Sequence, residues 1–328
     1  MATAPADLAP IQREGADEQF RHDVLVGLSQ AQKTVPARWF YDHRGSELFD
    51  EITRLPEYYP TRTETTILQA SAKRFGELSG RRPLVIVEFG AGSITKTPLL
   101  LDAIPTAAYV PVDISGAYLA EACAALAVRY PNLPIHAVEA DFGDPVQLPA
   151  NLALHPRLGF FPGSTIGNME PFAATDLLRS MRRTLGHKGQ LLIGFDRVKA
   201  QEALIAAYDD AQGVTAAFNL NLLVRINREL EGSIPVECFR HRAIWNPKRA
   251  RIEMHLAAIR DLSFEVNGQV FTMVSGETIH TENSHKYEPR SAEMLLLSGG
   301  WEPIETFEDE DCRFMVMLAR AIGPEQTA

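Results

Sequence analysis

Cysteine is scarce in this sequence. The three cysteines, Cys123, Cys238 and Cys312, lie far apart and are odd in number, so they form neither a zinc-binding spacing nor a redox pair. Cytoplasmic proteins keep their thiols reduced, and buried cysteine behaves as a small apolar residue. We therefore expect all three to be reduced core residues of a cytoplasmic protein.

Histidines in a metal-binding arrangement are missing as well. Among the nine histidines, His241 and His255 stand alone, and His280 and His285 lack a set of partner residues. The sequence therefore predicts a protein without a bound metal.

Long apolar runs and clusters of basic residues are also absent from the sequence. No apolar stretch reaches the roughly 20 residues of a membrane-spanning helix, and the first residues, MATAPAD, lack the basic start and apolar run of a signal peptide. The formal net charge is −10, and the arginines at 81–82 and 182–183 are pairs rather than patches, which argues against nucleic acid. These absences favour a cytoplasmic protein, expected to be a monomer, whose partner is a small molecule.

The segment 84–93, LVIVEFGAGS, is the most informative part of the sequence. An apolar run ends at Glu88, Gly90 and Gly92 follow as a turn, and a helical pattern covers 95–104. A buried parallel strand, a glycine turn and a helix N-terminus form a common nucleotide-binding arrangement, because glycine lets the backbone approach a ligand closely. The same pattern also occurs simply to pack a helix on a sheet.

Two acidic residues at later strand ends favour the nucleotide interpretation. Asp113 ends the segment 109–114, where an acid can accept hydrogen bonds from ribose hydroxyls. Asp141 and Phe142 end the next strand and could contact an adenine, although each acid could also be a solvated cap. The third glycine of a pyrophosphate-binding turn is missing, which makes S-adenosylmethionine a better ligand than a dinucleotide.

Predicted strands and helices alternate from Leu84 to Asp196. Five strands are expected, near 84–89, 107–113, 134–140, 157–162 and 189–195. This alternation is typical of a doubly wound parallel sheet. Upstream, Thr61-Arg-Thr-Glu64 has the pattern of a capping box, with Thr61 as the N-cap of a helix that reaches about Leu78.

The alternation stops after Asp196. Later elements are expected to be two helices within 199–230, a strand at 251–260, a hairpin at 262–274 that turns at Asn267-Gly268, a helix at 288–299, and strands at 301–307 and 313–320. The last two strands resemble the antiparallel pair that closes a methyltransferase sheet, so the expected fold class is α/β: a Rossmann-like class I methyltransferase sheet with a second, inserted α+β substrate domain. We assign 61–196 and 287–328 to the cofactor domain, 17–60 and 197–286 to the substrate domain, and 1–16 to a mobile tail.

Two regions concentrate residues that could act on a substrate. The segments 39–49 and 55–62 are rich in aromatic residues, which could either pack the core or form the wall of a ligand site. Asn168 follows the fourth strand, at the carboxyl edge where ligands of open α/β sheets bind. As an alternative, Asn168 could simply cap a loop.

These segments resemble the histidine Nα-methyltransferases of ergothioneine biosynthesis over about residues 20–320. The resemblance rests on seven strings, namely Phe40-Tyr-Asp, Gly45-Ser-x-Leu-Phe49, Leu55-Pro-Glu-Tyr-Tyr-Pro-Thr-Arg-x-Glu64, Glu88-x-Gly-x-Gly-Ser, Thr95-Lys-Thr, Gly163-Ser-Thr-Ile-Gly-Asn168 and Thr281-Glu-x-Ser284. The resemblance implies trimethylation of the α-amine of L-histidine to hercynine, with S-adenosylmethionine as methyl donor and no metal.

The resemblance also implies roles for individual residues. Those expected to bind the cofactor are Tyr58, Gly90, Lys96, Asp113, Asp141 and Phe142. Those expected to bind the substrate are Phe49, Tyr58, Gly163, Asn168, Tyr208, Met254, Glu282 and Ser284. Glu282 and Ser284 would hold the imidazole, and Asn168 and Tyr41 would be the catalytic residues beside the amine.

Two other functions remain possible on the sequence. One is an enzyme of the same family that methylates another amino acid or amine, and the other is a non-catalytic S-adenosylmethionine sensor. Glu282 favours histidine, because a carboxylate can accept a hydrogen bond from imidazole and is poorly matched to a phenyl ring. The cofactor acids and Asn168 are all present, which favours an enzyme over a sensor.

Overall fold

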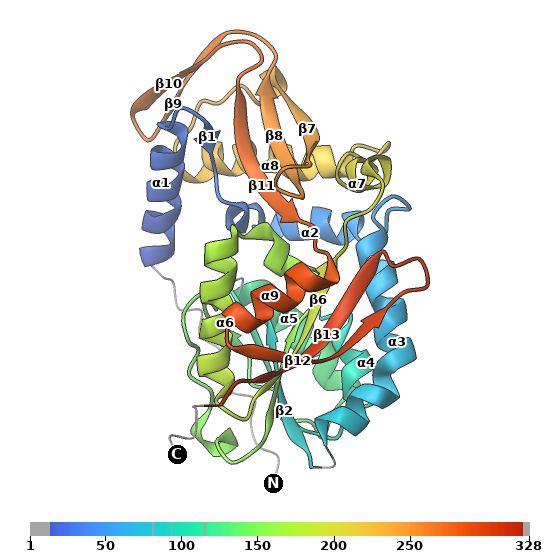
Figure 1. Cartoon of the computed structure of the whole chain (residues 1–328). Helices are drawn as coiled ribbons and strands as arrows, with labels where there is room; N and C mark the ends of the chain where they lie inside the picture. Colours follow the sequence, from blue (N-terminus) through green and yellow to red (C-terminus); the bar gives the residue numbers. More distant parts are fainter. Residues whose placement is uncertain (1–13, 81, 93, 115, 324–328) are drawn as a thin grey trace.

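A seven-stranded sheet forms one half of the molecule in the computed structural model, which describes residues 14–323 except 81, 93 and 115 (Figure 1). The strand order is β12-β13-β6-β5-β2-β3-β4, and β13 runs antiparallel to both neighbours while the other strands are parallel. The strands are β2 (Leu84–Phe89), β3 (Thr106–Asp113), β4 (Val138–Glu139), β5 (Arg157–Phe161), β6 (Gln190–Asp196), β12 (Trp301–Glu308) and β13 (Phe314–Ala321). An antiparallel β13 inserted beside β6 gives the Rossmann-like class I methyltransferase sheet that the sequence predicts.

Helices cover both faces of this sheet, which explains its apolar strands. Every residue of β2 is buried, as expected where a parallel strand is covered on both sides. One face packs on α3 (Tyr59–Ser79), α4 (Thr97–Leu101) and α5 (Gly116–Arg129). The other face packs on α6 (Pro171–Leu185) and α9 (Pro289–Ser298).

A second, four-stranded sheet lies at the other end of the molecule (Figure 1). Its order is β1-β11-β8-β7, from β1 (Lys33–Thr34), β11 (Thr278–His285), β8 (Arg251–Ala258) and β7 (Phe239–Asn246). Its core includes side chains of α1 (Glu14–Leu28), α2 (His43–Ile52), α7 (Gln201–Tyr208) and α8 (Val214–Glu229), and of the hairpin β9 (Leu262–Val266) and β10 (Gln269–Met273). Short 3-10 turns are η1 (Ala37–Phe40), η2 (Ala150–Leu152), η3 (Thr165–Asn168) and η4 (Val236–Cys238).

The chain leaves the large sheet after β6 and returns to it at the same place. Arg197 and Tyr287 form a parallel bridge, and the amide of Tyr287 donates to the carbonyl oxygen of Asp196 over 2.8 Å. The excursion between them forms most of the second sheet. The division into two domains at residues 60, 196 and 286 stays a prediction, and its two groups of segments correspond closely to the two sheets.

The predicted elements are mostly confirmed, with two corrections. All five parallel strands, the hairpin, the two helices after Asp196 and the closing strand pair are present. The capping box is wrong: α3 begins at Tyr59 with Tyr58 as its N-cap, because a proline occupies one of its first positions and Glu64 contacts other elements instead. Residues 14–16 of the predicted tail belong to α1, while 1–13 lie outside the described residues, as do Ser93 and 324–328.

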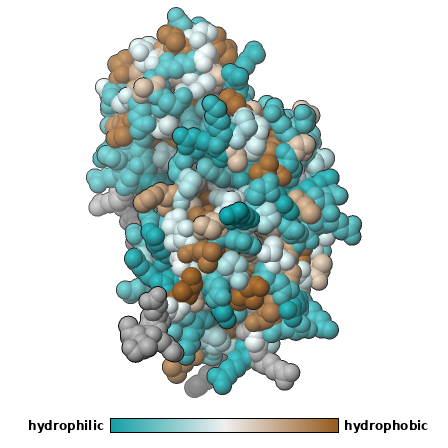
Figure 2. Space-filling view, viewed as in Figure 1, coloured by the Kyte–Doolittle hydropathy of each residue, from teal (hydrophilic) through white to brown (hydrophobic). Residues whose placement is uncertain are grey.

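The surface carries no continuous apolar face in the view of Figure 2, where hydrophobic residues form small groups among hydrophilic ones. Within the described part of the chain, no helix has the length and apolar character needed to cross a membrane. The expectation that all three cysteines belong to the core is wrong for Cys312, which is exposed in the turn between β12 and β13. Cys238 is buried and Cys123 partly buried.

Candidate active site

The turn after β2 brings two of the predicted cofactor residues, Gly90 and Asp113, to one edge of the sheet. Gly90 has a φ of 69° and donates its amide to the carbonyl oxygen of Val112 over 2.8 Å. Gly92 has a φ of 48° and donates its amide to the carboxylate of Asp113 over 3.0 Å. Glycine adopts these positive φ angles at little steric cost, so the backbone can fold back toward the end of β3. Asp113 therefore lies beside the turn, where a ribose-binding acid is predicted.

Phe142 lies over Gly90 at the same edge. A Cβ atom at Gly90 would lie 3.5 Å from Phe142 Cζ, an ordinary van der Waals contact, so the ring lies directly against the turn. The ring packs edge-on against Phe89 and Phe161, with centroid distances of 6.2 and 5.8 Å. The neighbouring Asp141 is exposed, and its Oδ1 accepts the Gly143 amide over 2.8 Å. The glycine turn, Asp113 and Asp141-Phe142 thus follow the neighbouring strands β2, β3 and β4, at the edge where an adenosine site is predicted.

Glu64 connects Lys96 to Gly163, a contact that sequence reasoning missed. The Glu64 side chain is 1% exposed and forms an ion pair with Lys96. Its carboxylate also accepts the Gly163 amide, with oxygen distances of 2.9 and 3.1 Å. Gly163 has a φ of 80°, and a Cβ there would lie 3.9 Å from Lys96 Nζ. Three elements that are distant in sequence, α3, the start of α4 and the loop after β5, therefore meet at one buried carboxylate.

A second buried carboxylate, that of Glu88, lies near the end of β2, just before the glycine turn. Its Oε2 accepts hydrogen bonds from the hydroxyls of Thr97 and Tyr109, the latter over 2.5 Å. Burial raises the pKa of Glu88 to about 7, although both hydroxyls and the nearby Lys96 favour the ionised form. Glu88 thereby ties the end of β2 to the first turn of α4 and to β3.

Four aromatic residues from separate elements form a continuous wall between the two sheets. Tyr41 packs edge-on against Phe49, with a centroid distance of 5.7 Å. Phe49 packs on Tyr58 at 6.2 Å, and Tyr58 packs on Tyr208 at 6.1 Å, in the same geometry. The structure therefore brings together the four aromatic residues that the resemblance assigned to the substrate.

Strand β11 carries the predicted imidazole-binding residues to the end of this wall. The Tyr208 and Ser284 hydroxyl oxygens are 2.7 Å apart. Glu282 pairs across the sheet with Met254 of β8, after a register shift that places a bulge between His280 and Glu282. The bulge puts the side chains of His280 and Glu282 on opposite faces of the sheet.

Asn168 ends η3, which packs directly on β11. The contact is tight: a Cβ atom at Gly167 would lie 2.7 Å from the carbonyl oxygen of His285. Asn168 is partly exposed, on the loop after β5, where the sequence placed it. The loop thus joins the carboxyl edge of the large sheet to the strand that carries Glu282 and Ser284.

The tyrosines of the wall stay neutral. Burial, followed by nearby negative groups that include Glu282, raises the pKa values of Tyr41, Tyr58 and Tyr208 well above their usual value. Burial also raises the pKa of Glu282 to about 7, while Lys286 lowers it. The site therefore offers neutral hydroxyls and one carboxylate that titrates near neutrality.

Four further polar residues beside the site were missed by sequence reasoning. Asp196 is buried at the end of β6 and forms ion pairs with Lys199 and Lys286. The Tyr59 hydroxyl contacts both carboxylate oxygens, at 2.8 and 2.9 Å. Burial alone would raise the pKa of Asp196, but the two ammonium groups hold it below its usual value. An acid at a strand end could have drawn attention to Asp196, whereas nothing in the sequence pattern pointed to Lys286.

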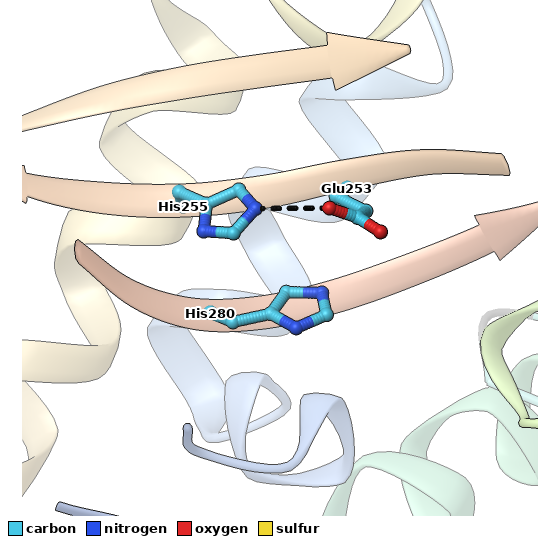
Figure 3. A group of neighbouring side chains, drawn as sticks. All are labelled: Glu253, His255 and His280. Carbon is cyan, nitrogen blue, oxygen red and sulfur yellow. Dashed lines mark hydrogen bonds and ion pairs between the residues drawn. The ribbon is translucent and has the colours of Figure 1, made fainter. Parts of the chain in front are cut away.

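The histidines need a correction. His255 is not isolated: its ring stacks on His280 with a centroid distance of 4.7 Å and an interplanar angle of 17°, and its Nε2 lies 3.4 Å from Glu253 (Figure 3). The potential metal-binding atoms of these three residues lie within 4.8 Å of one another. Because ring-nitrogen lone pairs lie in the ring plane, two nearly parallel stacked rings cannot both point at one ion unless one ring rotates. His280 Nε2 instead donates to the Glu282 carbonyl oxygen over 3.0 Å, which fixes the bulge.

Comparisons with known proteins agree with this geometry. The family described as "Histidine-specific methyltransferase, SAM-dependent" matches residues 20–321. The histidine N-alpha-methyltransferase of Mycolicibacterium smegmatis is 39% identical, over 93% of this chain and 96% of that protein. The enzyme of the same name from Mycobacterium tuberculosis is 40% identical, over 92% of this chain and 94% of that protein. Ergothioneine biosynthesis protein 1 of Schizosaccharomyces pombe is 25% identical over 92% of this chain, which spans 40% of that longer protein. The chain therefore belongs to the family of histidine-specific, S-adenosylmethionine-dependent methyltransferases.

Proposed function

We propose that this protein trimethylates the α-amino group of L-histidine to hercynine, a step of ergothioneine biosynthesis. Histidine would lie against the aromatic wall, with its imidazole toward Glu282 and Ser284 and its α-amino and carboxylate groups toward Tyr58, Asn168 and Tyr208. Phe49 and Met254 would line the site, and the loop at Gly163 would close it beside Lys96. These roles follow the residues that the structure groups between the two sheets.

One observation carries the proposal. The charges of Asp113, at the cofactor edge, and of Glu282, at the substrate end, both act on the Tyr41 hydroxyl. Tyr41 therefore lies near both the predicted ribose-binding acid and the predicted imidazole-binding acid, at one end of the aromatic wall. A methyl donor held by Gly90, Lys96, Asp113, Asp141, Phe142 and Tyr58 would meet an amine beside Tyr41.

The chemistry asks mainly for positioning. Bound S-adenosylmethionine supplies an activated methyl group, so the chain must align the lone pair of the amine with the methyl–sulfur bond. Neutral hydroxyls and the Asn168 amide can orient an amine without adding a negative charge that would keep it protonated. Alignment of this kind can contribute on the order of 7–11 kcal/mol to lowering a barrier. Neutral groups also suit a site that must accept the amine, the methylamine and the dimethylamine in turn.

We further propose that the protein works as a cytoplasmic monomer, without nucleic acid and without a metal. The two sheets would act as the two predicted domains, with the substrate between them. The net charge of −10 supports the absence of nucleic acid, and methyl transfer from a sulfonium requires no metal.

A competition experiment tests the proposal. The purified protein is incubated with S-adenosylmethionine and the twenty amino acids together, and products are identified by mass spectrometry. Histidine should gain one, two and three methyl groups on its α-amine. Methylation of another amino acid in its place would contradict the substrate, and binding of S-adenosylmethionine without any methylation would indicate a sensor.

A further inference from the structure

Lys286 lies directly behind the hydroxyl groups that are assigned to the substrate. Its side chain is fully buried, and its Nζ has three oxygen neighbours: Ser284 Oγ at 2.8 Å, Tyr208 Oη at 3.0 Å and Asp196 Oδ2 at 2.8 Å. A lysine ammonium carries three N–H donors and no acceptor. Each donor therefore has one partner, and none remains for a ligand.

These contacts restrict the hydroxyl protons of Tyr208 and Ser284. Both oxygens accept a hydrogen bond from Lys286, and they also lie 2.7 Å from each other. One hydroxyl must then donate to the other, and the receiving oxygen has both lone pairs occupied. The receiving hydroxyl can only donate its own proton outward. The pair thus presents an O–H donor to whatever lies in front of it.

We propose that Lys286 is a positioning residue that sets substrate specificity: it fixes the hydroxyl pair so that Tyr208 donates to Ser284 and Ser284 donates toward the substrate ring. This inference rests on the proposed function, because it assumes that the ring of the amino acid meets Ser284. It adds to that function the kind of ring the site selects: one that offers both an N–H and a bare ring nitrogen.

Glu282 supplies the complementary half of this selection. Its ionised carboxylate can only accept hydrogen bonds, whereas the hydroxyl pair donates one. A neutral imidazole satisfies both, with its N–H toward the carboxylate and its bare nitrogen toward the hydroxyl. An indole has an N–H but no bare nitrogen, and a phenyl ring has neither, so each would leave a buried polar group unpaired. The positive charge of Lys286 also favours the ionised form of Glu282.

The structure contains a matched control for Lys286. Lys199 is the second ammonium on the Asp196 carboxylate, and its other contacts are the Tyr59 hydroxyl and the Arg197 carbonyl oxygen. Lys286→Met and Lys199→Met therefore both remove one amine partner from the same buried acid. Only the first also releases the Tyr208 and Ser284 hydroxyls.

The test is a double-mutant cycle between Lys286→Met and Ser284→Ala, with Lys199→Met as control. Steady-state kinetics on histidine are measured at about pH 8, where a Glu282 with a pKa of about 7 is ionised. Lys286→Met should raise KM for histidine about tenfold, with a smaller change in kcat, since it removes the fixed donor. In the Ser284→Ala background, Lys286→Met should raise KM only about threefold or less, because the Ser284 hydroxyl that Lys286 holds in place is already absent. Lys199→Met should change KM by no more than about twofold.

The possible outcomes separate the proposed function from the role of Lys286. Wild-type protein that does not methylate histidine refutes the proposed function itself. Active wild type with an equal rise in KM for Lys286→Met in both backgrounds refutes the role of Lys286, as does an equal effect of the two lysine substitutions. Affinity for S-adenosylhomocysteine, measured by calorimetry, should stay within about twofold in all variants. If Lys286→Met does not fold, Lys286→Gln enters the same cycle under the same criterion.

Discussion

Glu88 should make the stability of this protein depend on pH in a way that a single substitution removes. Its carboxyl is buried beneath the glycine turn, and burial raises its pKa from 4.5 to about 7. Between these two values the folded protein keeps a proton that the unfolded chain has lost. The stabilising contribution is therefore complete below pH 4.5 and disappears as the pH rises through about 7.

The magnitude follows from the two pKa values. Integrated from pH 5 to pH 8, the difference in proton binding amounts to about 2.5 kcal/mol of unfolding free energy. Glu88→Gln cannot titrate, and its amide oxygen can still accept a hydrogen bond from Thr97 or Tyr109. Between pH 5 and pH 8, the unfolding free energy of the variant should therefore rise by about 2.5 kcal/mol relative to that of wild type. Other titrating groups, such as Glu282, affect both proteins equally and cancel.

Equilibrium urea unfolding, followed by tryptophan fluorescence at both pH values, measures this difference. Glu293→Gln, an exposed substitution on α9, is the control and should show the same pH dependence as wild type. If Glu88→Gln and wild type differ by the same amount at pH 5 and pH 8, Glu88 is not protonated in the folded protein and the reasoning from its burial fails.

Four further substitutions test the site. Asp113→Ala should weaken S-adenosylmethionine binding by roughly 1.5–3 kcal/mol, because a charged acceptor for the ribose is lost, and equal affinities by calorimetry would remove Asp113 from the site. Asn168→Ala should lower kcat by about a hundredfold with little change in cofactor affinity; unfolding near room temperature would instead support a loop-capping role. Glu282→Ala should raise KM for histidine about tenfold or more and relax discrimination against tryptophan, and an unchanged ratio of specificity constants would mean that the ring is recognised elsewhere. Glu64→Ala should destabilise the fold by about 3–5 kcal/mol in urea unfolding, because Lys96 loses its buried partner; a smaller loss would show that water replaces the carboxylate.

The large sheet could be predicted because its strands follow simple physical rules. The run 84–87 is apolar without alternation, as required of a strand covered on both faces, and Gly90 marks the only kind of residue that turns there easily. Asp113 could be placed beside this turn from the same rules. Here local pattern and global fold agree, so the residues at the sheet edge could be anticipated from spacing alone.

The second sheet was harder to predict, because residues with assigned functional roles interrupt the usual alternation of apolar and polar residues in β11. Strand β11 carries polar residues on both faces: His280 and Thr278 contact His255 outside, while Glu282 and Ser284 face the aromatic wall. No alternation of apolar and polar residues survives in it, and it was not predicted as a strand. Glu64 shows the opposite error, since its spacing from Thr61 fits a capping box while its side chain serves a distant contact.

The point where the chain leaves the large sheet and returns to it has an evolutionary consequence. Because Arg197 and Tyr287 lie side by side, everything between them begins and ends at one point on the rim of the large sheet. Such a segment can lengthen, shorten or be exchanged without displacing the strands that frame the methyl donor. The part of the acceptor site that this segment carries, including Met254, Glu282 and Ser284, is thus built as one cassette. New acceptor specificities could arise from changes within this cassette while the methyl-donor half stays as it is.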